Sequence, residues 1–137
     1  MSDIADFLRA RITERRALAE AAAASSEEIW DPGDEVYGSV VYEARSNAAV
    51  VVGPYDHLDW DIRRHIAAND PATVIADCDA KLRILDEVIP EIDAMDDRID
   101  GEWGVGDPGE RESMTLLRLL AQPFAGHSDH KGEEWAP

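Results

Sequence analysis

The densest group of chemistry-bearing residues in this chain is His127, Asp129 and His130, which fall within four residues. Two imidazoles and a carboxylate are ligands that zinc and similar divalent ions accept, and His65 or Cys78 would complete a set of four. One hypothesis is therefore a small metal-dependent hydrolase built on His65, His127, Asp129 and His130. Such a spacing is more often that of a solvated tail whose histidines cap or stack.

Other reactive side chains lack the context that catalysis requires. A general base at His65 would need a nucleophile and an orienting carboxylate, and the sequence contains no serine in a strained glycine turn. We expect His65 to pack on the apolar side of its helix, and Cys78 to behave as a small buried hydrophobe. These patterns favour a non-catalytic protein without a cofactor.

The strongest compositional signal is acidity, with 30 Asp and Glu against 13 Lys and Arg in 137 residues and a net charge of −17. A field of this sign disfavours direct contact with nucleic acid and with anionic membranes, and it favours a basic protein partner. The excess is densest over residues 71–112, which carry 13 acids and 4 bases.

Six of these acids lie at helical spacing and are assigned to the outer faces of one helix: Asp86, Glu87, Asp93, Asp96, Asp97 and Asp100. Two interpretations stay open. The group is either a solvated face in an acidic proteome, or a DNA-like surface whose carboxylates imitate phosphate rows and mask a basic nucleic-acid-binding groove.

The elements that must position these residues follow from apolar periodicity and from turn residues. We predict a helix over 3–24, a hairpin over 35–53, helices over 57–69, 71–99 and 108–122, and a tail over 123–137. Asp70-Pro71 is a strong helix start, and Pro90 should kink or split the helix that follows. The glycine-rich stretch 100–109 is predicted to be a loop.

These elements predict a mostly helical α+β fold in one domain, residues 1–137, with four to five helices, one β-hairpin and an irregular aromatic tail. An apolar seam over 75–99 should pack against the first helix, giving a monomer or a weak homodimer. We expect Phe124 and Trp135 to fold back on the body. A lone cysteine, with neither a leader nor an apolar run of membrane-spanning length, favours the cytoplasm.

Two stretches carry a resemblance to a known family. They are residues 65–75, His-Ile-Ala-Ala-Asn-Asp-Pro-Ala-Thr-Val-Ile with Ala80-Lys81 downstream, and residues 116–127 with Trp135 and Pro137 beyond them. The chain resembles an uncharacterised family of small acidic proteins from actinobacteria and their phages. The resemblance implies a setting in which DNA mimics act against host defences, and it implies no chemistry. The expected function is a non-catalytic acidic protein-binding module, with the metal-dependent hydrolase as the alternative.

Overall fold

A computed structural model describes residues 2–36, 38, 40–53, 58–103 and 111–137. Helices dominate these residues, and three short strands form an antiparallel sheet, which confirms the predicted α+β class. Contacts in space between Cα positions divide the chain into two compact units. Unit 1 comprises Met1–Glu14 and Ala80–Pro137, and unit 2 comprises Arg15–Asp79. That the whole chain forms one domain stays a prediction.

Unit 2 contains the sheet, whose strand order is β1-β2-β3. The predicted hairpin is present as β2 (Val40–Glu43) and β3 (Ala49–Val52), although both strands are shorter than the β-rich stretches of the sequence. A third strand, β1 (Trp30–Asp31), pairs with β2, with Trp30 opposite Glu43. This strand lies before the predicted hairpin, and Gly33 between β1 and β2 has a φ of 75°.

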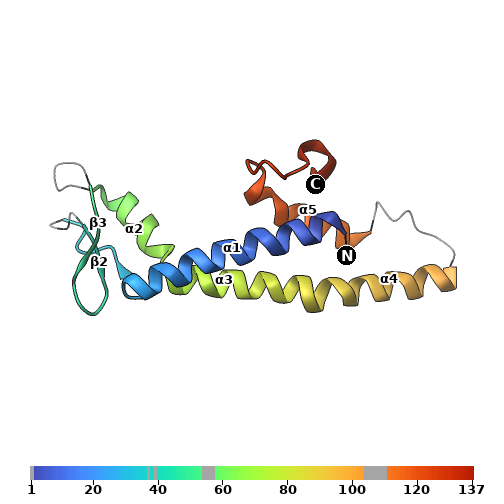
Figure 1. Cartoon of the computed structure of the whole chain (residues 1–137), viewed down its shortest axis with the longest axis horizontal. Coiled ribbons are helices and arrows are strands. Elements are labelled where there is room, and N and C mark those ends of the chain that lie inside the picture. The colour runs from blue at the N-terminus through green and yellow to red at the C-terminus, as the bar shows by residue number, and fades with distance from the viewer. Residues whose placement is uncertain (1, 37, 39, 54–57, 104–110) are drawn as a thin grey trace. The chain divides into compact units, whose positions relative to one another are not determined.

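Helix α2 (Trp60–Ala68) follows the sheet, and Figure 1 shows it beside the strands. Residues 58 and 59 precede the helix although the prediction included them, and residue 57 lies outside the described part. Arg63 is the largest fully buried side chain of the described residues, with 1% of its surface exposed. Its guanidinium donates to the backbone carbonyls of Leu58, Pro32 and Asp34. Arg63 thus connects the segment between β1 and β2 to α2.

The predicted helix start at Asp70 is confirmed, because α3 (Pro71–Arg83) begins at the proline. The Asp70 carboxylate accepts a 2.8 Å hydrogen bond from the backbone N–H of Thr73, which satisfies a donor that the first helical turn leaves open. Its other oxygen accepts from the N–H of Trp30 at 3.4 Å. One buried carboxylate therefore caps α3 and fixes β1.

A π turn precedes Pro90. Helix α3 passes into η2 (Ile84–Val88) and then into α4 (Ile89–Trp103), and the ribbon runs on through these residues without a break (Figure 1). The N–H of Ile89 bonds to the carbonyl of Ile84, five residues back. In a regular helix the proline ring would clash with the carbonyl of Asp86, and a π turn widens the helix at that point. The kink or split that was expected at Pro90 is thus replaced by a π turn directly before the proline.

The end of this helix differs from the prediction. Residues 100–103 were expected in a loop and instead form the last turn of α4. The remainder of the predicted loop lies outside the described residues. Helix α5 spans Glu112–Ala121 within the predicted 108–122. The glycine at position 101 is tolerated inside α4 at the modest cost of a helical glycine.

The π turn also changes which side chains of α4 face the core. It adds one residue to a turn, so that later residues are rotated by about 100° relative to an unbroken helix. Leu85 and Ile89 are buried as expected, but beyond them Asp93 and Asp100 are half-buried while Ile99 is 50% exposed. The apolar seam predicted over 75–99 is therefore wrong at Ile99, although Ile92 is still half-buried.

In unit 1, the first turns of α1 (Asp3–Ser25) bury Ile4, Leu8 and Ile12. Arg9 on this helix is paired with Asp86 on η2, so the predicted packing of the first helix against the 75–99 helix holds within this unit. Leu18 was expected on the same apolar face, but it lies in unit 2 and is 72% exposed. The next residue, Ala19, is 7% exposed, so in unit 2 the buried side of α1 does not include Leu18.

The predicted return of the tail is confirmed. Trp135 is 6% exposed, and its ring lies 5.0 Å from that of Phe7, while Phe124 packs edge-on against Phe7 at 6.3 Å. Two short 3₁₀ helices, η4 (Gln122–Phe124) and η5 (Gly132–Trp135), give the tail more regular structure than expected. None of the helices among the described residues is both long and apolar enough to cross a bilayer.

Candidate protein-binding face

The acidic residues of η2 are held by arginines of the chain. The Asp86 carboxylate lies 2.5 Å from a guanidinium nitrogen of Arg9. Glu87 pairs with Arg83 at 3.0 Å, one turn earlier. All four side chains remain at least a third exposed, so each pair adds little to stability. The carboxylates are nevertheless oriented and keep access to solvent.

Two further acids meet Arg111, which lies immediately before α5. Asp97 accepts a 2.8 Å bond from Arg111, and Asp100 lies 3.5 Å from the same nitrogen. The hydrogen bond to Asp97, together with the negative charges of Asp97, Asp100 and Asp93, raises the pKa of Arg111 above its usual value. This arginine therefore neutralises part of the acidic charge on α4.

The two remaining acids are partly withdrawn from solvent. Asp93 accepts a 2.5 Å hydrogen bond from the hydroxyl of Ser113, which is only 4% exposed. One carboxylate oxygen of Asp96 is buried without a hydrogen-bond partner in the part of the chain that the structure describes. The prediction that all six acids lie on the outer faces of the helix is therefore wrong for Asp93, Asp96 and Asp100, which are half-buried. The rotation after the π turn brings Asp93 and Asp100 towards α5.

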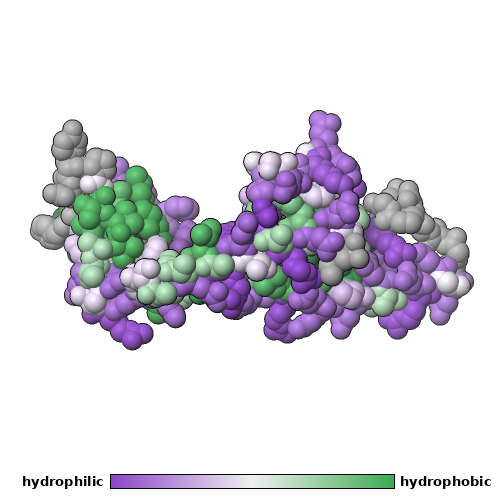
Figure 2. All heavy atoms as spheres, in the orientation of Figure 1, coloured by the Kyte–Doolittle hydropathy of each residue, from purple (hydrophilic) through white to green (hydrophobic). Residues whose placement is uncertain are grey.

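The helix also exposes an apolar stripe, defined here as Val88, Met95 and Ile99. Their residues are 41%, 54% and 50% exposed. Spacings of seven and four place them on one helix face. The sequence alone had placed Ile99 in the buried seam and the other two beside it, so this stripe was missed. Figure 2 shows mostly hydrophilic residues over α4 in that view.

Carboxylates border this apolar stripe. Glu91 lies three residues after Val88 and four before Met95, and Asp96 and Glu102 flank Ile99 at three residues on either side. Residues three and four apart are neighbours on a helix surface. Glu91 and Glu102 are exposed, and Asp96 is half-buried. The face thus combines apolar contact area with negative charge at its edges.

The histidines of the metal hypothesis occupy a different place, around the ring of Phe7. The His127 ring lies 5.7 Å from Phe7, bonds to the guanidinium of Arg11, and accepts from the N–H of Asp129 at 3.1 Å. The His130 ring lies 5.8 Å from Phe7 and accepts from the N–H of Gly132 at 3.0 Å. These contacts give both imidazoles packing and turn-forming roles.

His65 and Cys78, either of which was expected to complete the metal site, also have defined places in the structure. His65 is exposed on α2, so the expectation that it packs on an apolar side is wrong. Cys78 is 1% exposed, which confirms its expected burial. Within the described ranges, no three His, Cys, Asp or Glu side chains come together as a group that could hold a metal ion.

Comparison with known proteins gives a family and no activity. The model of a family of unknown function, DUF6221, matches residues 1–137, so the chain belongs to that family. Neither a curated protein nor a solved structure matches the chain.

Proposed function

We propose that this member of DUF6221 is a non-catalytic acidic module that binds a basic protein through the exposed face of η2 and α4. The observation that carries the proposal is the apolar stripe of Val88, Met95 and Ile99 with carboxylates along its edges. Exposed apolar side chains at helical spacing are typical of a face that another protein covers. The proposed contact is therefore apolar at its centre and electrostatic at its rim.

The net charge of −17 supports the sign of the partner. A strongly negative surface accelerates association with a basic one and repels acidic competitors. Carboxylates of Asp86, Glu87 and Asp97 are 52%, 57% and 66% exposed even though each is paired with an arginine. Each can accept a second cation without breaking its existing pair, because a carboxylate has several acceptor sites.

The masking of a nucleic-acid-binding groove is the more specific form of the proposal. Asp86, Glu87 and Asp97 keep exposed carboxylates over eleven residues of the η2–α4 helix, about 16 Å at the rise of a helix. A row of carboxylates at such intervals can occupy a groove that otherwise holds phosphates. The proposed setting is the cytoplasm of an actinobacterium or of a cell infected by one of its phages, as the sequence resemblance suggests. The module itself would bind neither nucleic acid nor membrane, and would act as a monomer or weak homodimer.

The proposal is tested by affinity capture from a lysate of the source organism, with three immobilised baits. They are the wild-type chain, the variant M95S/I99S, and the control L119S, which removes an exposed apolar residue of α5 instead. We expect a basic protein on the wild-type and control baits that M95S/I99S fails to retain. Elution should occur at a few hundred millimolar salt, since screening shortens the range of charge attraction.

The captured protein is then purified and its affinity measured at low and physiological salt. Converting Glu91 and Glu102 to Gln should lower the association rate more than it raises the dissociation rate. If duplex DNA competes with the module for the captured protein, the groove-masking form is supported. Equal capture by all three baits, or affinity independent of salt and of Glu91 and Glu102, would refute the proposal.

The metal-dependent hydrolase on His65, His127, Asp129 and His130 remains the alternative, and none of the contacts described above favours it. Elemental analysis of the purified chain tests it directly. A transition metal in stoichiometric amount, lost in the variant H127A/H130A, would replace the binding-module proposal.

A further inference from the structure

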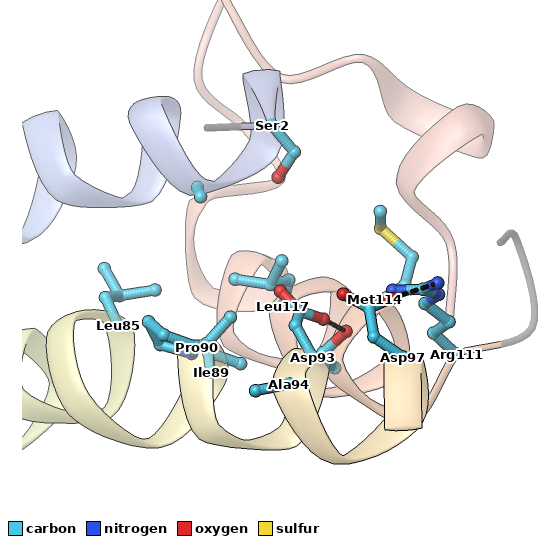
Figure 3. Close-up of a pocket in the computed structure, with 12 residues that line it drawn as sticks. Ser2, Leu85, Ile89, Pro90, Asp93, Ala94, Asp97, Arg111, Met114 and Leu117 are labelled. Atoms are coloured by element: carbon cyan, nitrogen blue, oxygen red, sulfur yellow. Dashed lines mark hydrogen bonds and ion pairs between the residues drawn. The ribbon is translucent and has the colours of Figure 1, made fainter. Parts of the chain in front are cut away.

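Unit 1 contains a cavity of about 420 Å³ between the start of α1, the η2–α4 helix and α5 (Figure 3). Its size falls within the roughly 300–1,000 Å³ typical of small-molecule sites. The apolar part of its wall comes from all three helical segments and includes Ala5, Leu85, Ile89, Met114 and Leu117. The apolar stripe described above does not line it. The cavity is therefore a separate feature of the α4 helix.

The polar part of the wall lies along one side, where Asp93 and Asp97 project from α4 towards α5 (Figure 3). The hydroxyl of the buried Ser113 donates to one Asp93 oxygen at 2.5 Å and so fixes the carboxylate. Arg111 is the cation of this wall, and Asp97 and Asp100 both contact it. Among the described residues, Arg111 forms its ion pairs with those two acids, and its charge acts on Asp93 without a direct contact.

We propose that this cavity binds a small amphipathic organic cation, an ammonium group on an apolar body. The ammonium would lie against the second oxygen of Asp93, and the apolar body against Leu85, Met114 and Leu117. A charged hydrogen bond in a partly desolvated site is stronger than a neutral one, and the apolar wall supplies affinity in proportion to the area that it removes from water. A neutral ligand of the same shape cannot form the charged hydrogen bond to Asp93, and an anion is repelled by the carboxylates of Asp93 and Asp97.

The probes for the test are n-octylammonium, 1-octanol and octanoate, which share an apolar body and differ in charge. Binding is followed by calorimetry and by NMR of chain labelled at the methionine methyl groups. Met114 lines the cavity, whereas Met95 lies outside it on the exposed stripe. We expect octylammonium to shift the Met114 methyl signal and leave that of Met95 in place, to bind about tenfold more tightly than octanol, and octanoate not to bind.

Three variants separate the cavity from general acidity. D93N keeps an oxygen for Ser113 and removes the charge, so it should weaken octylammonium by about tenfold and leave octanol unchanged. E91Q removes one exposed charge on the same helix outside the cavity and should leave both affinities unchanged. A94L enlarges an exposed residue of the cavity wall, and with its circular dichroism spectrum retained it should abolish the binding of both ligands.

The inference is overturned if octylammonium and octanol bind equally, if E91Q weakens binding as much as D93N, or if the Met95 signal shifts in place of Met114. It is also overturned if none of the three probes binds the wild-type chain. These outcomes are independent of the proposed protein partner, because neither Met95 nor Ile99 lines the cavity.

Discussion

The buried guanidinium of Arg63 donates a 2.5 Å hydrogen bond to the carbonyl oxygen of Pro32. It also bonds to the carbonyl of Asp34 at 2.9 Å, and it stacks over Trp60 at 5.1 Å. Replacing Arg63 with Met should lower the free energy of unfolding by about 3 kcal/mol, because the backbone carbonyls of Leu58, Pro32 and Asp34 lose their donor. Urea unfolding followed by circular dichroism measures the change.

Arg64 provides the matched control for that experiment. It is the next residue of α2, it also stacks over Trp60, at 5.8 Å, and it is exposed. R64M should change the free energy of unfolding by less than about 0.5 kcal/mol. Similar losses in R63M and R64M would mean that stacking on Trp60, and not the carbonyl bonds, accounts for the effect.

The π turn of η2 supports a second comparison, between Leu85 and Val88. Leu85 is 4% exposed, and L85A should cost about 2–5 kcal/mol in the free energy of unfolding, as for a leucine in a packed core. Val88 is 41% exposed, so V88A should cost less than about 0.5 kcal/mol. Thermal unfolding of both variants, monitored by circular dichroism, gives the two values. Reversal of their order would place the core on the other side of the helix.

Removal of the Trp135 side chain tests the return of the tail. The indole packs against Phe7 and is 6% exposed, so W135A should cost about 3–5 kcal/mol. E133A, two residues earlier and exposed, should leave stability unchanged. Limited proteolysis should then cleave W135A after residue 123 much faster than the control. If W135A retains wild-type stability and resists cleavage, the contact with Phe7 contributes nothing.

The ion pair between Asp3 and Lys131, 2.9 Å long, gives a dependence on pH. The hydrogen bond and the positive charge of Lys131 hold the pKa of Asp3 below its ordinary 3.8. The pKa of Asp3 is lower in the folded chain than in the unfolded chain. The ion pair therefore stabilises the fold above pH 3.8, and this stabilisation is lost as the pH falls through the pKa that Asp3 has in the folded chain. An NMR titration of the Asp3 carboxyl should show its midpoint rising in K131M and staying low in K131R. An unchanged midpoint in K131M would exclude the pair in solution.

Local signals in the sequence were enough for much of the fold. Asp70 next to Pro71 marked a helix start, because the cap and the proline act within one turn. The hairpin was recognised from its β-branched strands, whereas β1 was missed because two residues carry too little periodicity to identify a strand. Arg63 was missed for another reason. Two of its three partners are backbone carbonyls about thirty residues earlier, and no side-chain pattern encodes them.

The candidate binding face was predicted only in part, and Pro90 explains why. Uniform helical periodicity assigned Ile99 to the core and Asp93 to the surface. The π turn before the proline shifts the register, so that Ile99 is exposed and Asp93 meets Ser113. Sequence reasoning recognised that Pro90 disturbs the helix. It could not tell a kink from an added residue in the turn, because the choice depends on packing against residues distant in the sequence.

The ring of Phe7 has a consequence for how the chain acquires its structure during synthesis. Its neighbours His127, His130 and Trp135 are made more than a hundred residues later. The contacts within Arg15–Asp79, by contrast, all join residues fewer than seventy positions apart. On a ribosome that adds residues from the N-terminus onward, this middle segment can fold while Phe7 still lacks its partners. The aromatic cluster can therefore close only after Trp135 has left the exit tunnel.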